Sequence, residues 1–212
     1  MVIDKKQLTT RERQAIERKQ QLLNAARVLF AEKGFRGTST KEINQSIGLA
    51  DGLLYYYFPK GKKQVLDAII EEAFQKKEQL ADSLFNAVES TDPLREALFK
   101  IFSSAWNGVA EEANRLTIMI IIHEQPLLQK EQVTWISYVF DHSIARLAHF
   151  FETYVQSGEL RPLNCTFMAR HVMNLFQSTC FNHIFIAGQS ELDESTLRDV
   201  HANIDFLLEC WR

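Results

Sequence analysis

The sequence predicts an all-α protein, on three observations. Glycine and proline contribute only 8 and 4 of the 212 residues, fewer than turn-dense β proteins need. Apolar residues recur at steps of three and four along most of the chain, the spacing of an amphipathic helix. No segment alternates strictly between apolar and polar residues, as a half-buried strand would. We therefore expect a helical chain whose glycines and prolines mark the helix ends.

The first helix is expected over residues 11–33. Its apolar side chains fall on one stripe, formed by Leu22, Ala25, Ala26, Leu29 and Phe30. Gly34 follows, and glycine adopts a positive φ without steric cost. Phe35 can then fold back on Phe30, so we expect a Schellman motif at the end of this helix.

Two short helices follow, separated by a glycine turn. Ser39 and Glu42 have the spacing of a capping box, which begins a helix that ends at Gly48. The aromatic residues 55–58 belong to the next helix, which ends before Pro59. The pattern is helix, turn, helix, at the end of an N-terminal three-helix head.

One long helix, residues 62–89, is expected to connect this head to the rest of the chain, because its apolar residues keep helical spacing without a break. Further helices are expected at about 93–107, 111–124, 131–157, 165–187 and 193–211. We divide the chain into an N-terminal domain, residues 1–61, and an all-helical C-terminal domain, residues 62–212.

The formal net charge of −3 is the sum of a positive N-terminal segment and a negative remainder of the chain. Residues 1–66 hold 13 Lys and Arg against 6 Asp and Glu, whereas residues 67–212 hold 11 against 21. A basic end joined to an acidic remainder suits a protein that binds a polyanion at one end. The alternative is a solvated charged surface without a partner.

Two short helices about a glycine turn meet the physical requirement for reading the major groove of duplex DNA. Hydroxyl and ammonium groups at the start of the first helix can bond phosphate oxygens, as can the phenol hydroxyls of the second helix. Gly52 permits close approach of the backbone to the bases, and Leu53 offers an apolar surface to a thymine methyl group. The candidate DNA-binding residues are Thr40, Lys41, Gly52, Leu53, Tyr55, Tyr56 and Lys62. Alternatively, the hairpin is purely structural and its tyrosines belong to the core or to an interface.

The residues before and at the start of the first helix are rich in basic side chains. They form an arm that contacts the minor groove or phosphates, or else a frayed terminus. The basic residues are Lys5, Lys6, Arg11, Arg13, Arg18 and Lys19.

Residues 22–35, Leu-Leu-Asn-Ala-Ala-Arg-Val-Leu-Phe-Ala-Glu-Lys-Gly-Phe, resemble the N-terminal signature of TetR-type bacterial transcriptional regulators. The resemblance continues through Gly48-Leu49, Gly52 and Leu54-Tyr-Tyr-Tyr-Phe58 and covers about residues 15–70. It implies a homodimer with a three-helix DNA-binding head and a C-terminal α-helical domain that holds an effector pocket. It also implies that the candidate residues given above stand where relatives touch DNA.

Several positions depart from the family pattern. Ala50 stands where relatives have a serine cap, so the second helix lacks that side-chain acceptor. Asp51 stands in place of a lysine and repels phosphate. Asn44 replaces an alanine. The turn that follows Phe58 is one residue longer than in most relatives, which leaves open whether Lys60 or Lys62 is the phosphate-binding lysine.

The C-terminal domain carries a predicted dimer interface. Residues 165–187 are apolar on more than one side, and the last helix has one apolar stripe, so we expect these helices to pack against their symmetry mates as a four-helix bundle. The alternative is ordinary core within one chain. The candidate interface residues are Met168, Val172, Leu175, Leu197, Val200, Ile204, Leu208 and Trp211.

Large side chains from separate helices suggest an apolar effector cavity, although such residues are often simply core. His123, His142 and His183 could orient a polar group of the effector, although a satisfied histidine of the core or surface is the other reading. The candidate effector-binding residues are Phe102, Trp106, Met119, His123, Phe140 and Phe176.

Nothing in the sequence supports an enzyme. It contains no phosphate-binding glycine loop and no nucleophile elbow, so we expect no catalytic residues and no cofactor. His149 and Glu152 share a helix face, but two ligands alone do not make a metal site. The longest purely apolar run is 118–122, and Cys165, Cys180 and Cys210 lack disulfide or metal spacing. We expect a cytoplasmic protein without a membrane span.

These observations give a hypothesis with two rivals. The hypothesis is a dimeric repressor that binds a near-palindromic DNA operator and is released by a small, largely apolar effector, through movement of the long helix. The first rival is an effector-independent DNA-binding protein that organises or blocks chromosomal sites. The second is a helical carrier of a small molecule or metal.

Overall fold

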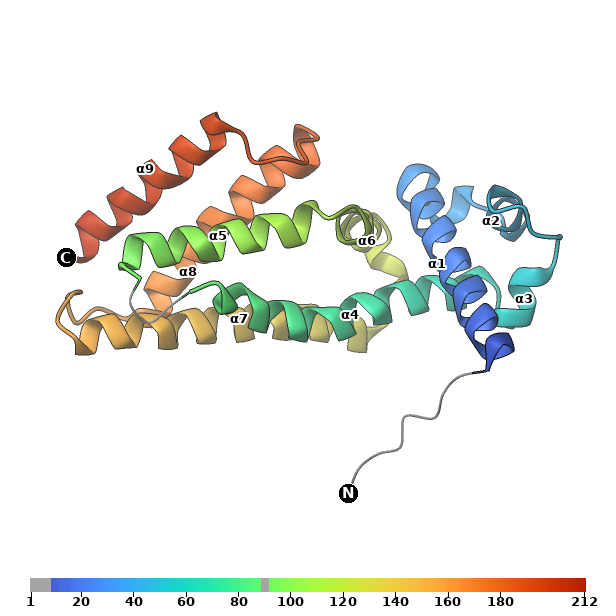
Figure 1. The fold of residues 1–212 in the computed structure, drawn as a ribbon, viewed down its shortest axis with the longest axis horizontal. Helices are drawn as coiled ribbons and strands as arrows, with labels where there is room; N and C mark the ends of the chain where they lie inside the picture. Colours follow the sequence, from blue (N-terminus) through green and yellow to red (C-terminus); the bar gives the residue numbers. More distant parts are fainter. Residues whose placement is uncertain (1–8, 89–91) are drawn as a thin grey trace, which may run out of the picture. The chain divides into compact units, whose positions relative to one another are not determined.

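The computed structural model describes residues 9–88 and 92–212, and these residues are predominantly helical, with no β-strand among them. The first helices are α1 (Thr10–Gly37), α2 (Thr40–Ser46), α3 (Leu53–Tyr57) and α4 (Lys62–Asn86). They are followed by α5 (Leu94–Ala110), α6 (Glu112–His123), the 3₁₀ turn η1 (Gln125–Leu127), α7 (Lys130–Gln156), α8 (Cys165–Cys180), the π-helical turn η2 (Phe181–Ile186) and α9 (Glu194–Trp211) (Figure 1). The expected all-α fold is confirmed. The one helix expected over 165–187 is instead α8 followed by η2.

The chain forms two compact units. The first ends at Glu72 and also contains Leu116–Leu127, and the second contains Ala73–Arg115 and Leu128–Arg212. The sequence placed the boundary between residues 61 and 62, at the start of α4. In the structure both α4 and α6 contribute to both units.

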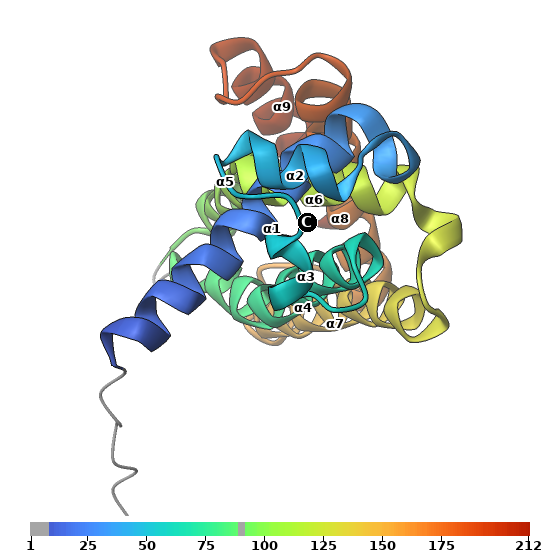
Figure 2. The same ribbon diagram turned by 90° about the vertical axis from the view of Figure 1, so that its right-hand side faces the viewer.

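The core of the first unit is built where α1, α2, α3 and the start of α4 meet, and Figure 2 shows α1, α2 and α3 facing the viewer. Fully buried apolar side chains come from each of these helices, among them Leu22, Phe30, Ile43, Leu54 and Leu66. The hydrophobic stripe of α1 therefore supports the two short helices, which are too short to be stable alone.

The end of α1 differs from the expected Schellman motif. Gly34 has the expected positive φ of 73°, and the rings of Phe30 and Phe35 lie 5.4 Å apart. However, its ψ of 164° is extended, outside the left-handed region that the motif requires. The Phe35 amide donates to the carboxylate of Glu124 at 2.8 Å. The Schellman prediction is therefore wrong, although the aromatic contact is present.

The second unit has its core between α5, α7, α8 and α9. Helix α8 packs against all three of the others, which explains why it is apolar on more than one side. The outward faces of α8, η2 and α9 carry exposed phenylalanines, Phe167, Phe181 and Phe206.

The structure places most of the predicted dimer-interface residues inside the chain, and their contact with a second copy stays a prediction. The side chains of Met168, Val172, Val200, Ile204, Leu208 and Trp211 are buried within the single chain, and Leu175 and Leu197 are half-buried. The six buried side chains are enclosed by their own chain, whereas Leu175 and Leu197 keep part of their surface exposed. The six form intrachain core because α5 and α7 cover the faces that the sequence had assigned to a partner.

Candidate nucleic-acid interface

Helix α2 begins with the predicted capping box. The Ser39 amide donates to Glu42 Oε2 at 2.8 Å, and the Glu42 amide donates to Ser39 Oγ at 3.1 Å. Lys33 Nζ lies 3.1 Å from Glu42 Oε1. The backbone hydrogen bond from Ser39, together with Lys33, lowers the pKa of Glu42 to about 2. The start of α2, where Thr40 and Lys41 lie, is therefore fixed by local bonds.

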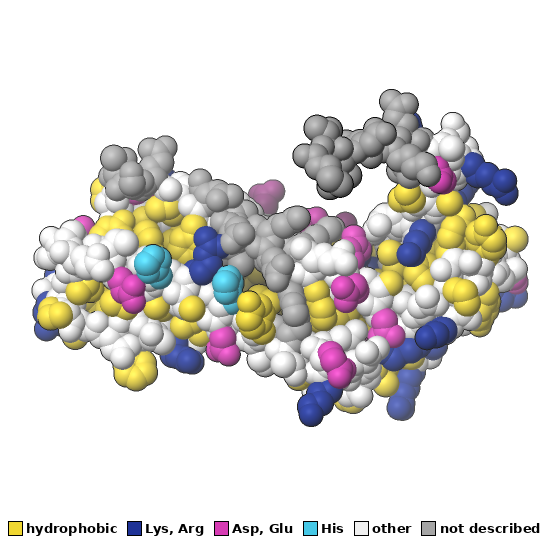
Figure 3. Space-filling model, turned by 90° about the horizontal axis from the view of Figure 1, so that it is seen from below, with side chains coloured by type: hydrophobic (Ala, Val, Ile, Leu, Met, Phe, Trp, Pro, Cys, Tyr) yellow, Lys and Arg dark blue, Asp and Glu magenta, His cyan; other side chains and the backbone are white. Residues whose placement is uncertain are grey.

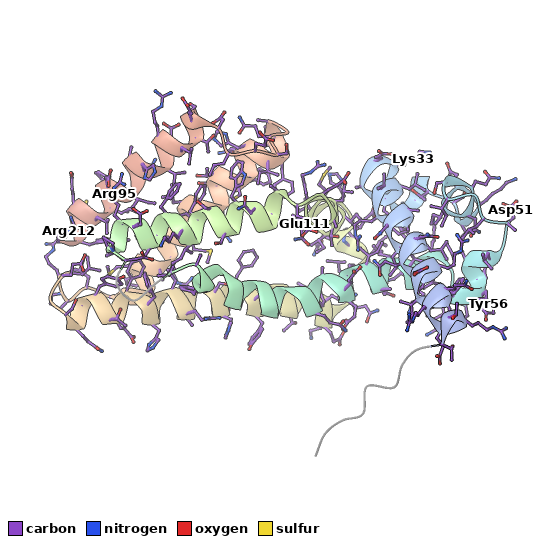
Figure 4. All side chains as sticks on the ribbon, viewed as in Figure 1. Lys33, Asp51, Tyr56, Arg95, Glu111 and Arg212 are labelled. Atoms are coloured by element: carbon purple, nitrogen blue, oxygen red, sulfur yellow. The ribbon has the colours of Figure 1, made fainter. Side chains whose placement is uncertain are left out.

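Helix α3 presents its polar aromatic side chains to solvent. Tyr55 is 51% exposed and Tyr56 is 73% exposed, whereas Leu54 and Phe58 are buried. Leu53 is half-exposed. Figure 4 shows Tyr56 and Asp51 on the surface of the first unit. The alternative that Tyr55 and Tyr56 belong to the intrachain core does not hold.

Gly52, the N-cap of α3, has a φ of 93°, and no side chain caps the helix from this position. A side chain there would be strained although a Cβ would meet open space. Gly52 is therefore required by the turn itself, in addition to any role in approaching DNA.

A shallow cleft of about 600 Å³ lies beside Tyr55, between the α1–α2 turn and the start of α4. Its charged side chains are all basic, and several Lys and Arg side chains stand out on this unit at the right of Figure 3. The cleft can accept an anion of phosphate size. Its lining residues are Phe35, Arg36, Gly37, Thr38, Ser39, Thr40, Tyr55, Lys60, Gly61, Lys62 and Lys63.

The two candidate phosphate-binding lysines differ in their surroundings. Lys62 Nζ donates to the backbone oxygens of Phe35 at 2.7 Å and Thr38 at 2.9 Å, and it lies 4.5 Å from the centre of the Phe35 ring. Lys60 is exposed. Lys62 therefore ties α4 to the α1–α2 turn, while the side chain of Lys60 extends into solvent.

Lys41 and Asp51 face one another across the two helices. Lys41 Nζ lies 3.7 Å from Asp51 Oδ2, and both side chains are largely exposed. Such a pair contributes little to stability. It does place a carboxylate beside one of the cations expected to contact phosphate.

The sequence-based reasoning treated Asn44 only as a departure from the family and missed its role in this site. The side chain of Asn44 is fully buried, and its Oδ1 accepts a hydrogen bond from the Leu54 amide at 3.1 Å. The signal available in the sequence was a polar amide, Asn44, at a position where relatives have alanine.

The basic residues near the N-terminus divide into two groups. Arg11, Arg13, Arg18 and Lys19 are exposed on the first turns of α1, which Thr9 and Glu12 begin with a capping box. This part is helical and not a frayed end, and its contact with the minor groove or phosphates stays a prediction. Lys5 and Lys6 lie outside the described residues.

The six candidate effector-binding residues are divided between the two compact units. Phe102, Trp106 and Phe176 pack in the second unit, with ring centres 6.1 Å apart for Phe102 and Trp106 and 5.0 Å for Phe102 and Phe176. Met119 and His123 belong to the first unit. His123 and Phe140 have exposed side chains, so neither belongs to an enclosed cavity in this chain. The sequence could not predict this distribution, because helical spacing places a side chain on a face of a helix but does not identify what covers that face.

Two of the three candidate histidines have side-chain partners in the structure. His183 Nδ1 lies 2.8 Å from Gln189 Oε1 and 3.1 Å from Thr196 Oγ1, so it has polar partners of its own chain. The His142 ring stacks on Tyr138, with 5.8 Å between the ring centres.

His149 pairs with Glu152 at 3.0 Å, and no group of three or more potential metal ligands occurs in the described part of the chain. No helix in residues 9–88 and 92–212 is both long and apolar enough to cross a membrane.

Two family profiles match the sequence. Residues 22–69 match the bacterial regulatory proteins of the tetR family, and residues 96–212 match the C-terminal domain of AefR-like transcriptional repressors.

Individual relatives agree with these profiles. The transcriptional repressor KstR2 of Mycolicibacterium smegmatis is 28% identical over 111 residues, 49% of this chain and 54% of that protein. The regulator AcrR of Shigella flexneri is 27% identical over 178 residues, 79% of this chain and 80% of that protein. The chain thus spans about half the length of KstR2 but most of AcrR.

Solved structures share the fold. A tetR-family regulatory protein from Rhodococcus has a TM-score of 0.65 and 18% identity, covering 90% of this chain and 95% of the other. PfmR from Thermus thermophilus has a TM-score of 0.63 and 22% identity, covering 95% and 97%. With the family profiles on the helix-turn-helix head and on more than half of the chain, the protein belongs to the TetR family of bacterial transcriptional regulators, which are not enzymes.

Proposed function

We propose that this protein is a sequence-specific DNA-binding repressor that acts as a homodimer on a near-palindromic operator and is released by a small-molecule effector. The proposal is supported most by one observation, the basic cleft beside the exposed Tyr55. A recognition helix with exposed aromatic side chains next to a basic cleft suits major-groove binding, in which phosphate contacts position the helix and base contacts select the sequence.

The DNA contacts divide into two kinds. Thr40, Lys41, Tyr55, Tyr56 and one of the cleft lysines bind phosphates, whereas Leu53 and the backbone at Gly52 approach base edges. Phosphate contacts raise affinity for all sequences, while base contacts discriminate between them.

Binding of fragments selected from random duplex DNA tests this division. Tyr55→Phe should weaken binding to all selected and unselected sequences by a similar factor. Leu53→Ala should change the preferred bases with a smaller loss of affinity for unselected DNA. Equal effects of the two substitutions would contradict the division, and failure to select any sequence at low salt would remove the proposed function.

The dimer forms through the outward face of α8, η2 and α9. This face carries Phe167, Phe181 and Phe206, each at least 47% exposed. A two-fold operator needs a two-fold protein, and exposed aromatic side chains are typical of protein interfaces.

Phe206→Glu should convert the dimer into a monomer in sedimentation experiments. Phe140→Glu provides a control, because Phe140 on α7 is also exposed, at 43% against 63% for Phe206. A monomeric wild-type protein, or an equal effect of the two changes, would contradict this interface.

An effector of apolar character with one hydrogen-bond acceptor suits the second unit. Phe102 and Phe176 form an aromatic cluster with Trp106, whose Nε1 is buried and has no hydrogen-bond partner among the described residues. Related proteins are named a ketosteroid regulator and a fatty acid degradation regulator.

Operator release by an effector is tested with a steroid ketone and a long-chain fatty acid as probes. A compound of this class should lower operator affinity of the wild type and act less on Trp106→Phe. If no compound of either class binds in calorimetry, the rival of an effector-independent DNA-binding protein is favoured instead.

A further inference from the structure

The recognition helix α3 has no N-cap side chain to accept hydrogen bonds from its first backbone amides. It has five residues, and an isolated helix of that length is unstable in water. The first amides of any helix need acceptors outside the helix, normally from an N-cap side chain. Here the N-cap is Gly52, which has no side chain, and no side-chain cap is formed there.

Acceptors for these amides come from three places. The Leu53 amide donates to the Ala50 oxygen at 3.2 Å, and the Tyr55 amide donates to the Gly52 oxygen at 3.0 Å. The amide between them, on Leu54, donates to Asn44 Oδ1 at 3.1 Å. This is the one bond of the three that comes from outside the turn, from a residue ten positions earlier on α2.

Asn44 binds the turn at both of its ends. Its backbone oxygen accepts from Leu49 at 2.9 Å and from Ile47 at 3.4 Å, at the exit from α2. Its side-chain oxygen accepts from Leu54 in the first turn of α3. Asn44 therefore bonds to residues on both sides of the turn that joins α2 and α3.

The burial of Asn44 makes this contact costly. Asn44 and Leu54 are both 0% exposed, and Asn44 Nδ2 has no hydrogen-bond partner among the described residues. An unpaired buried amide group destabilises the folded protein. An apolar residue at position 44 removes the unpaired Nδ2 but leaves the buried Leu54 amide without its side-chain acceptor, so one unsatisfied buried group replaces another.

We propose that Asn44 is a positioning residue for DNA recognition, which caps α3 through the Leu54 amide in place of the missing N-cap side chain. This inference rests on the proposed function. Leu53 and Tyr55, the neighbours of Leu54, take their direction toward DNA from this bond. Loss of the bond lets α3 reorient, which weakens base contacts more than it weakens general attraction to phosphates.

The test compares operator binding with binding to unselected DNA, by fluorescence anisotropy at one salt concentration. Asn44→Ala should lower the affinity for the selected operator about tenfold, in the range expected for a lost cap. Its affinity for unselected DNA should change by less than about threefold. Equal losses on both kinds of DNA, or no loss at all, would overturn the proposal.

Two further variants separate positioning from folding. Asn44→Asp keeps an accepting oxygen and should bind the operator more tightly than Asn44→Ala. Ala50→Ser adds a side-chain acceptor next to the start of α3, and in the Asn44→Ala background it should recover part of the lost affinity. Absence of both effects would contradict a capping role. Thr196→Val, a change at an equally buried site in the second unit, serves as a control that lowers stability but not operator affinity.

Hydrogen exchange of the Leu54 amide supplies a measurement without DNA. Exchange should be faster in Asn44→Ala than in the wild type, with amides in the middle of α1 unchanged. If the wild type selects no DNA sequence but this acceleration is seen, the proposed function is wrong, whereas capping of α3 by Asn44 is supported. If the acceleration is absent, the cap itself is wrong.

Discussion

Glu124 and Phe35 are 89 positions apart in the sequence, yet the Glu124 carboxylate accepts a 2.8 Å hydrogen bond from the Phe35 amide. The bond lies where α1 ends, beside the cleft that Phe35 and Lys62 line. The residue that completes this turn therefore comes from just after α6, within the same compact unit.

We expect Glu124→Ala to lower the free energy of unfolding by about 1–3 kcal/mol, because a hydrogen bond from an amide to a charged group is lost. Glu124→Gln keeps an acceptor and should lose less. Denaturant unfolding measures both variants. Glu159→Ala, which removes an exposed carboxylate in the second unit, is the control. Equal stability of the wild type and Glu124→Ala would show that the bond contributes nothing.

Gly34 and Gly37 provide a matched pair of glycine substitutions. Gly34 has a φ of 73°, and a Cβ there would lie 3.3 Å from Glu124 Oε1. Gly34→Ala should therefore destabilise the protein by about 1–2 kcal/mol. Gly37 has no positive φ, and a Cβ there makes ordinary contact at 3.5 Å. Gly37→Ala should be neutral or stabilising by up to about 1 kcal/mol, and thermal unfolding distinguishes the two.

Lys60 and Lys62 should respond differently to removal of their charge. Lys62→Ala removes the donor of two backbone carbonyls and should lower both stability, by about 1–2 kcal/mol, and DNA affinity. Lys60→Ala should lower DNA affinity and its salt dependence without a loss of stability. Parallel measurements of unfolding, and of DNA binding at several salt concentrations, distinguish the roles of the two lysines. A stable Lys62→Ala variant would contradict the structural role of Lys62.

Asp51 should oppose DNA binding. Asp51→Asn removes a charge that repels phosphate and frees Lys41 from its 3.7 Å partner. We expect affinity for any duplex to rise about twofold to fivefold at low salt, and the gain to shrink at higher salt because exposed charges are screened. Glu17→Gln, an exposed change of equal charge on α1, serves as the comparison. Similar gains from both would assign the effect to net charge alone.

Acid should loosen the start of α2. The pKa of Glu42 is lowered from 4.5 to about 2 by its bonds to Ser39 and Lys33. The folded state thus favours the carboxylate, so the stabilisation is complete above pH 4.5 and is lost as the pH falls toward 2. Glu42→Gln should reduce the loss of stability over this window, as measured by circular dichroism. If Glu42→Gln and the wild type lose stability over the same pH range, titratable groups other than Glu42 cause the acid transition.

Much of the fold could be predicted from local sequence patterns. The Ser39–Glu42 capping box, the positive φ of Gly34 and the Phe30–Phe35 contact all involve residues within six positions of one another. Local bonds and backbone sterics depend little on the rest of the chain. The helices and the exposed aromatic residues of α3 follow from the same kind of pattern.

The site could be predicted only in part. The sequence identified Thr40, Tyr55, Lys60 and Lys62 of the cleft, but it could not tell that Lys62 is bonded to the Phe35 and Thr38 oxygens while Lys60 is exposed. It identified Asn44 as unusual without its partner, Leu54. These contacts need two helices to be placed side by side, which no local pattern specifies.

The sequence by itself determined that this protein is helical, that a basic helix-turn-helix head begins it and that its family is TetR. The tertiary structure decided which surfaces remain available. Val172 and Ile204 were expected to meet a second copy but are buried in their own chain, whereas Phe167 and Phe206 are exposed. The reason is physical: the spacing of apolar residues says that a helix face is covered, and only packing says by what.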